Sequence, residues 1–203
     1  MIRTRLIILM TLSFITLLPA LSFAGAVNLP KTGQETCYDE NGNVIECSGT
    51  GQDGDIQAGV EWPEPRFVDN GDGTVTDKLT GLMWLKDASC IGKKMWRDAL
   101  DGVADFNTNP SNYSCTDYTA NYTDWVLPNI IELESLVNAE ESNTAVWLNT
   151  QGFNNVIWSF YWSASNYGEI YTNYSWYVDM GTGSVSYFYN PGSLYVWPVR
   201  GGQ

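Results

Sequence analysis

Residues 66–77 read Arg66-Phe67-Val68-Asp69-Asn70-Gly71-Asp72-Gly73-Thr74-Val75-Thr76-Asp77. Two short extended runs flank Asn-Gly and Asp-Gly pairs, which readily adopt the positive φ angles of tight hairpin turns. The stretch therefore predicts a β-hairpin. A second turn at residues 79–81 leads into a further strand over residues 82–85. The acidic turn lacks the ligand spacing of an EF-hand loop, so we interpret it as a plain turn and not as a calcium site.

Two amphipathic helices are predicted after the hairpin. In the first, apolar residues recur at helical spacing and charged residues occupy the opposite side. The apolar set is Trp96, Ala99, Leu100, Val103 and Phe106, and the charged set is Lys93, Lys94, Arg97, Asp98 and Asp101. We expect the second helix to begin near Pro128, because proline suits a first helical turn, and to run through Val137.

Short strands are predicted again beyond Trp147, over residues 161–163, 176–179, 185–189 and 195–200. In the second of these, Trp176 and Val178 alternate with polar neighbours, so one face can enter a core while the other meets solvent. Indoles at helical or alternating spacing are more often structural than functional. We therefore assign core packing to Trp84, Trp96, Trp125, Trp162 and Trp176.

The N-terminal part of the chain has the pattern of an exported protein. Arg3 and Arg5 precede an apolar run that ends in Ser22-Phe23-Ala24, so we interpret residues 1–24 as a signal peptide. A retained membrane anchor is the alternative, but the run is short of the roughly 20 apolar residues that span a bilayer. Residues 25–61 are rich in glycine and acidic residues and predict a linker arm closed by a local disulfide. Residues 62–203 are expected to form one domain.

The chain is strongly acidic. Its formal net charge is −13, and removing the two arginines of residues 1–24 changes this to −13 − 2 = −15. An acidic surface repels phosphate backbones and anionic lipids, so we expect neither nucleic acid nor anionic membranes as partners. Because residues 1–24 are interpreted as a signal peptide, no membrane span is expected after their removal. The expected location is secreted, periplasmic or at the cell surface.

The chain has four cysteines and no histidine. An even cysteine number in an exported chain favours two disulfides, for which three pairings are possible. Cys37 and Cys47 flank a short turn, so their local pairing is the most economical and leaves Cys90 with Cys115. A zinc site would need closer spacing, and Ser-His and Cys-His catalytic pairs are excluded, so we predict no metal and no cofactor.

The last forty residues combine Tyr, Trp, Asn, Ser and Gly with almost no charge. Tyrosine supplies rigid amphipathic contact area, and Asn, Ser and Gly supply adaptable hydrogen bonding, as in antibody binding sites. This segment is therefore the predicted ligand-binding surface. The candidate residues are Asn166, Tyr167, Tyr171, Asn173, Tyr174, Tyr177, Tyr187, Tyr189, Asn190 and Tyr195.

The order of five motifs carries a family resemblance. They are residues 66–77, Thr80-Gly81-Leu82-Met83-Trp84, Asp124-Trp125-Val126-Leu127-Pro128, Tyr161-Trp162-Ser163-Ala164-Ser165 and Val199-Arg200-Gly201-Gly202. Together they resemble the Lcl C-terminal domain family, named after a bacterial collagen-like adhesin. The resemblance implies a C-type-lectin-like α+β fold, in which two helices flank a small twisted antiparallel sheet. Val126 departs from the family pattern, which usually has arginine there, and a buried salt bridge of that arginine is expected to be missing.

The C-terminal segment also resembles, more weakly, the variable proteins of diversity-generating retroelements. These systems rewrite adenines near the end of a gene and so enrich Asn, Tyr, Ser, Thr and Asp at exposed sites. Residues 166–195 have that composition, with Trp176, Val178 and Val196 as apolar anchors between the variable positions.

Three classes of function are compatible with the sequence. We favour an exported binding module, adhesin or lectin-like, that recognises a glycan or an extracellular protein without calcium. The alternative is a structural protein of the cell envelope that docks a partner chain through the same aromatic surface. An enzyme would need two carboxylates about 5–10 Å apart, and Glu169 with Asp179 is the only acidic pair in the segment, so catalysis is not expected.

Overall fold

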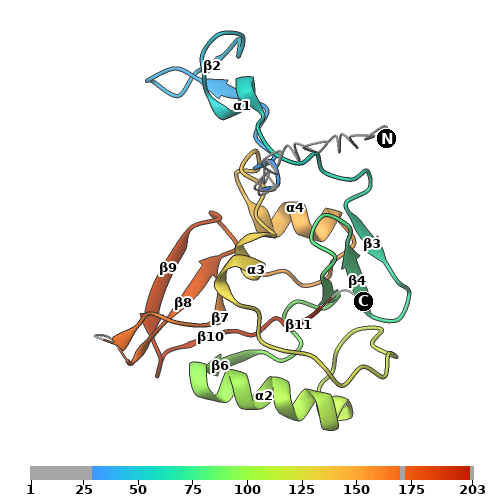
Figure 1. Ribbon diagram of the computed structural model, residues 1–203. Coiled ribbons are helices and arrows are strands. Elements are labelled where there is room, and N and C mark those ends of the chain that lie inside the picture. Colours follow the sequence, from blue (N-terminus) through green and yellow to red (C-terminus); the bar gives the residue numbers. More distant parts are fainter. Residues whose placement is uncertain (1–28, 170–171, 202–203) are drawn as a thin grey trace, which may run out of the picture.

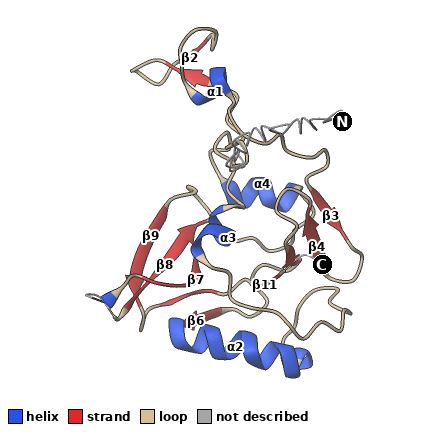
Figure 2. Cartoon of the chain, in the orientation of Figure 1, coloured by secondary structure: helices blue, strands red, loops and turns tan. Residues whose placement is uncertain are grey.

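The computed structural model describes residues 29–169 and 172–201, so the expected signal peptide, residues 1–24, lies outside the described part. The described chain is α+β, as predicted (Figures 1 and 2). Its strands are β1 (Cys37–Tyr38), β2 (Val44–Ile45), β3 (Phe67–Asp69), β4 (Thr74–Asp77), β5 (Met83–Leu85), β6 (Lys93–Met95), β7 (Phe160–Asn166), β8 (Tyr174–Asp179), β9 (Val185–Tyr189), β10 (Ser193–Tyr195) and β11 (Val199–Arg200). Its helices are α1 (Asp53–Ile56), α2 (Trp96–Thr108), the 3-10 helix η1 (Pro110–Asn112), α3 (Ile130–Glu134) and α4 (Thr144–Thr150).

The predicted hairpin forms β3 and β4 of a four-stranded sheet with the order β11-β5-β4-β3. Gly71 and Gly73 of its turn have φ angles of 75° and 84°, which glycine adopts without strain. A Cβ at Gly73 would lie 2.4 Å from the Tyr118 Cα atom, whereas a Cβ at Gly71 would meet no atom within 4 Å. Gly73 therefore serves two purposes, a turn conformation and a close approach of two backbone segments.

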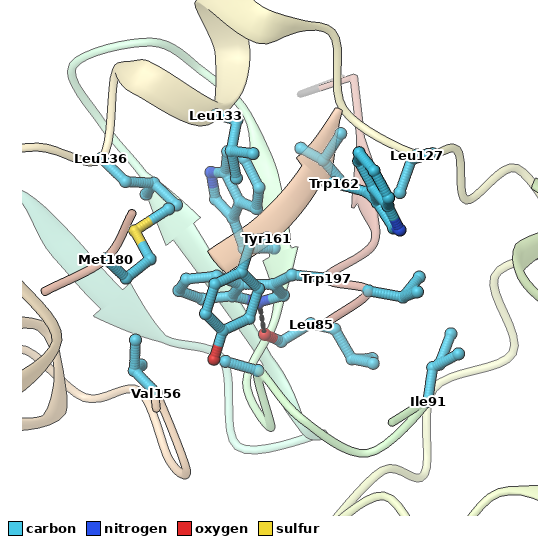
Figure 3. Packing of buried hydrophobic residues seen from close by; sticks show 14 of the residues in the cluster. Leu85, Ile91, Leu127, Leu133, Leu136, Val156, Tyr161, Trp162, Met180 and Trp197 are labelled. Atoms are coloured by element: carbon cyan, nitrogen blue, oxygen red, sulfur yellow. Dashed lines mark hydrogen bonds between the residues drawn. The ribbon is translucent and has the colours of Figure 1, made fainter. Parts of the chain in front are cut away.

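The second large sheet has five strands in the order β6-β10-β7-β8-β9, and β7 pairs with β10 in parallel. The strand predicted over residues 195–200 is in fact two strands in different sheets. Between them lies Trp197, whose indole N–H donates to the Leu85 carbonyl at 2.7 Å (Figure 3). The expectation of one small sheet with two helices is wrong because this crossing divides the strands between two large sheets, with a two-stranded sheet in the arm.

Helix α2 confirms the first predicted helix and buries Ala99, Val103 and Phe106 against the core. Lys93 and Lys94 were expected on the polar side of this helix, and that expectation is wrong. They lie in β6, which pairs with β10. The helical spacing therefore begins only after this strand ends.

The second predicted helix is shorter than expected. Helix α3 begins after Asn129, whose side chain forms a capping box with Glu132, and it ends at Glu134 instead of continuing to Val137. Helix α4 was not predicted. It has only seven residues and starts after Asn143, whose side-chain oxygen accepts the Val146 N–H.

Four tryptophans form the centre of the core. They are Trp84, Trp125, Trp162 and Trp197, each at most 2% exposed. Figure 3 shows Trp197 beside Tyr161, and Trp162 near Leu127, with leucine, valine and methionine side chains around them. Trp96 is partly exposed and packs against this core, and its indole N–H donates to the Ser163 carbonyl at 2.8 Å. Trp176 lies outside the core cluster, so its predicted role is wrong.

Both disulfides join the cysteines that the sequence favours, Cys37 with Cys47 and Cys90 with Cys115. The first closes a small unit made of β1, β2 and α1, which projects from the rest of the chain (Figure 1). The arm is therefore closed by its local disulfide, as predicted.

Glu140 anchors this arm to the domain. Its carboxylate accepts the backbone N–H groups of Glu35 at 2.8 Å and of Thr36 at 2.9 Å. The Thr36 hydroxyl also donates to it, and that bond, followed by the two backbone bonds, holds the pKa of the Glu140 carboxyl below its ordinary value. The anchor is therefore strongest when Glu140 is ionised.

Candidate functional site

Most of the predicted binding residues that the structure describes lie at or near the hairpin of β8 and β9, at one edge of the five-stranded sheet (Figure 1). The register places Tyr174 opposite Tyr189 and Trp176 opposite Tyr187. Side chains of directly opposed residues share one side of a sheet, and so do those two positions apart. These four rings therefore project from the same side of the hairpin.

Tyr167, which follows β7, joins the same group. Its ring centroid lies 4.1 Å from that of Tyr187 and 5.1 Å from that of Trp176. Tyr174 and Tyr189 are 5.6 Å apart and complete a continuous cluster. We call Tyr167, Tyr174, Trp176, Tyr187 and Tyr189 the aromatic face. Tyr187 and Tyr189 are 44% and 48% exposed, so solvent reaches its outer part.

Two of the predicted tyrosines lie elsewhere. Tyr177 projects from the opposite side of β8, where it packs against Phe160 at 4.8 Å and Phe188 at 6.4 Å. Tyr195 lies on β10 and stacks on the buried Tyr161 ring at 5.3 Å. Tyr171 lies outside the described residues. The sequence groups these residues by composition, but the sheet separates them.

The three asparagines surround the hairpin without forming one binding group. Asn166 is exposed at the end of β7, and its side-chain oxygen accepts the Ser175 hydroxyl at 3.4 Å. Asn173 and Asn190 lie opposite each other, because the Asn190 N–H donates to the Asn173 carbonyl at 2.7 Å. The side-chain oxygen of Asn190 is buried without a hydrogen-bond partner among the described atoms. Asn173 is the exposed member of this pair.

Electrostatics on the aromatic face are weak, since none of its five side chains carries a formal charge. The acidic pair considered for catalysis does not come together there. Glu169 lies in the connection between β7 and β8, whereas Asp179 ends β8 and accepts the Gly181 N–H at 2.8 Å in the following turn. The strand between them is about 17 Å long at 3.3–3.4 Å per residue step. Asp179 thus has a structural role in the β8–β9 turn.

Two hollows occur away from the aromatic face, and the sequence did not indicate either. One of about 260 Å³ is lined by residues that include Tyr113, Tyr118 and Asn121. The other, of about 210 Å³, lies between the arm and the domain and is lined by residues that include Lys31 and Trp62. Neither of these two hollows is lined by a residue of the aromatic face.

Neither a metal cluster nor a membrane-spanning helix occurs in the described part of the chain. No three or more His, Cys, Asp or Glu side chains in residues 29–169 and 172–201 are arranged to hold a metal ion. No helix among the same residues is long and apolar enough to cross a bilayer. Independence from calcium remains a prediction.

Position 126, where the family pattern has arginine, is at the surface and not in the core. The Val126 side chain is 52% exposed, and its backbone pairs with Val199. The neighbouring ion pair joins Asp124 to Arg200, with 2.7 Å between the Asp124 Oδ1 and Arg200 Nε atoms. This hydrogen bond lowers the pKa of the Asp124 carboxyl. An arginine at position 126 would therefore lie at the surface, beside an ion pair that is already formed.

Comparison with known proteins gives one family match. The family model described as the Lcl C-terminal domain matches residues 73–200, which contain strands β4 to β11 and the aromatic face. A comparison with curated proteins finds no match.

Proposed function

The chain belongs to the Lcl C-terminal domain family, and from that premise we propose that it is an exported ligand-binding domain, adhesin-like or lectin-like, that acts through its aromatic face. The exposed ring cluster on the β8–β9 hairpin carries this proposal. Its ligand is a glycan or an extracellular protein. We also propose that the fold is related to that of C-type lectins. The domain would bind its ligand without calcium and without catalysing a reaction.

The packing of the rings favours binding. Tyr167, Tyr187 and Trp176 contact one another, so their side chains lose little further freedom when a ligand arrives. Tyrosine and tryptophan dominate the binding energy of many interfaces because each buries a large apolar area and still offers a polar group.

Two disulfides support an oxidising location, since such bonds persist mainly in exported proteins. Extracellular or periplasmic placement also agrees with the expected signal peptide. The division into an arm over residues 25–61 and a domain over residues 62–203 is part of this proposal.

Binding should be tested with the exported chain, residues 25–203, on a panel of glycans and glycosaminoglycans. The informative variant is the double substitution Tyr187→Ala and Tyr189→Ala. The control is Tyr38→Ala, because Tyr38 is 41% exposed on the arm, far from the hairpin. We expect the double variant to lose about 2 kcal/mol or more of binding free energy, as hot-spot residues do, while the control binds normally.

The possible results separate the candidate functions. Glycan binding that survives the double substitution would contradict a role for the aromatic face. A folded protein that binds no glycan would shift the proposal to the other ligand class, a protein, including permanent docking of an envelope partner. Loss of binding on adding a chelator would contradict calcium independence.

We further propose that the sequence of residues 166–195 is diversified by a retroelement. The aromatic-face tyrosines lie on an edge hairpin, outside the buried cluster, so their replacement leaves the core intact. The gene would then have a nearby near-copy of its own end, differing only at adenines of that copy. Sequencing the locus tests this point, and the absence of such a copy would refute it.

A further inference from the structure

The outer edge of β9 is a second feature of the proposed site. Strand β9 ends the five-stranded sheet, and no described strand pairs with its outer side (Figure 1). Its residues are Val185, Ser186, Tyr187, Phe188 and Tyr189, which include no charge and no proline. Its pairing with β8 has no register shift. Charges, prolines and bulges are the usual means by which proteins prevent edge strands from pairing, and β9 has none of them.

The hydrogen-bond pattern shows which backbone groups face outward. The Asn190 N–H donates to the Asn173 carbonyl, and the Asp179 N–H donates to the Ser184 carbonyl. In an antiparallel pair such hydrogen-bonded positions alternate with positions whose backbone groups point away. Ser186 and Phe188 therefore bond to β8, whereas the N–H and C=O groups of Val185 and Tyr187 point outward. No described residue forms a backbone hydrogen bond with these outward groups.

We propose that the ligand of the aromatic face is an extended polypeptide segment that pairs with β9 as a sixth strand. This inference rests on the proposed function and names its ligand class. A strand added to β9 would place alternate side chains beside Tyr187 and Tyr189 on one side of the sheet and beside Phe188 on the other. All three rings are between 41% and 48% exposed. Backbone bonds would give affinity and the rings would give selectivity.

Charge favours a foreign strand over a second copy of this chain. The chain has a formal charge of −13, so two copies repel each other when they approach within the Debye length, about 8 Å at physiological ionic strength. Asp179 ends β8 at the turn into β9, and Glu169 is exposed in the connection between β7 and β8. A segment with apolar alternate residues and a lysine or arginine near its end would complement this edge.

The test uses a displayed library of random heptapeptides selected on the exported chain. Synthetic copies of the selected peptides are then added while amide hydrogen exchange is followed by NMR. The proposal predicts new protection of the Val185 and Tyr187 amides. The Ser186 and Phe188 amides should already be protected without peptide, because they bond to β8, and they report that the hairpin is folded.

A matched pair of variants isolates the backbone contribution. Tyr187→Pro and Tyr187→Thr both remove the ring, but only proline removes the outward N–H, and proline is tolerated where that N–H faces solvent. We expect the proline variant to bind the selected peptides about tenfold more weakly than the threonine variant, as expected for the loss of one net hydrogen bond. Equal affinities, with Ser186 and Phe188 still protected, would overturn the strand-addition geometry.

The other results also decide the question. If no peptide is selected but a glycan binds and is lost with Tyr187→Ala and Tyr189→Ala, the proposed function stands and this inference fails. If neither class binds, both fail. If Val185 and Tyr187 become protected only as protein concentration rises, the edge pairs with a second copy, and the foreign-strand proposal is refuted.

Discussion

The buried ion pair of Arg66 and Asp77 gives the sharpest test of how the hairpin motif holds the fold. Their side chains are 3% and 0% exposed. The Arg66 Nε atom donates to Asp77 Oδ1 at 3.0 Å and its Nη2 atom donates to Oδ2 at 2.8 Å, while Nη2 also reaches the Ser135 carbonyl at 2.6 Å. Asp77 in addition accepts the Leu79 N–H at 3.0 Å and the Thr80 hydroxyl at 2.9 Å. One buried carboxylate thus links the segment before β3 to the turn after β4.

Arg66→Met keeps the apolar stem but leaves Asp77 buried without its cation. Removing one partner of a buried pair costs about 3–5 kcal/mol. Two donors to Asp77 remain, so we expect a loss near the lower end, about 3 kcal/mol of unfolding free energy. Arg97→Met is the matched control, because the Arg97–Asp101 pair is 77% and 65% exposed. That substitution should cost only about 0.3–0.5 kcal/mol, as expected for an exposed helical pair.

Urea denaturation of the disulfide-intact protein, followed by tryptophan fluorescence and by far-UV circular dichroism, measures both losses. Coinciding transitions would support two-state analysis, and linear extrapolation then gives the free energy of unfolding. Arg200→Met should lie between the two other variants, because the Arg200 side chain is 9% exposed but that of Asp124 is 48% exposed. If Arg66→Met cost no more than Arg97→Met, burial would not determine the strength of these pairs and our reasoning would be wrong.

Three further predictions follow from the geometry of the turn, the arm and the second disulfide. Gly71→Ala should cost about 1 kcal/mol of unfolding free energy, because alanine is strained in the left-handed backbone conformation. Gly73→Ala should cost about 1–3 kcal/mol more, because its Cβ would overlap a neighbouring backbone segment. Equal losses in urea denaturation would contradict the close approach. The pKa of Glu140 is lowered in the folded protein, so its anchoring is present above the unfolded pKa and is lost as pH falls through the folded pKa. Glu140→Gln at neutral pH, like acidification of the native chain, should speed amide exchange in the arm before the domain unfolds, and unchanged exchange would count against this anchor. Replacing Cys90 and Cys115, which are 25 positions apart, by alanine should cost about 3.5 kcal/mol from loop entropy, measured by the same denaturation; a change within error would show that the unfolded chain is constrained by other means.

The sequence predicts best those elements whose signals are local. The Asn-Gly and Asp-Gly turn around Gly71 determines the first hairpin without help from distant residues. Helix α3 shows the opposite case, because the apolar spacing continues to Val137 but the helix ends at Glu134. Beyond the helix, the Ala139 N–H donates to the Thr32 carbonyl of the arm. The Glu140 carboxylate accepts the backbone N–H groups of Glu35 and Thr36, also in the arm. These tertiary contacts prevail over helical propensity in that segment.

The candidate site was predictable in composition but not in geometry. Period-two alternation places Tyr174 and Trp176 on one side of β8. Their partners Tyr187 and Tyr189 depend on the register set by the Asp179 turn, and the exposure of all four depends on β8 and β9 lying at a sheet edge. Strand order is a non-local property, because β10 returns to pair with β7 and β6 instead of with β9. The wrong assignment of Trp176 to the core has the same cause, because its alternation with polar neighbours does not show that β8 lies next to the edge strand.

The separation between core and aromatic face has a consequence for specificity. The hairpin is held by backbone pairing and by Val178, which is fully buried, whereas Tyr187 and Tyr189 are nearly half exposed. Both rings contact neighbouring rings of the aromatic face, but these contacts lie outside the core, so their loss should cost less than the roughly 3–5 kcal/mol of a large aromatic core truncation. The same side chains would dominate contact with a ligand. Under the proposed function, replacing them should therefore change ligand binding more than it changes folding. An edge strand adds to this independence, because backbone pairing gives any extended ligand a common geometry while the surrounding rings select among ligands.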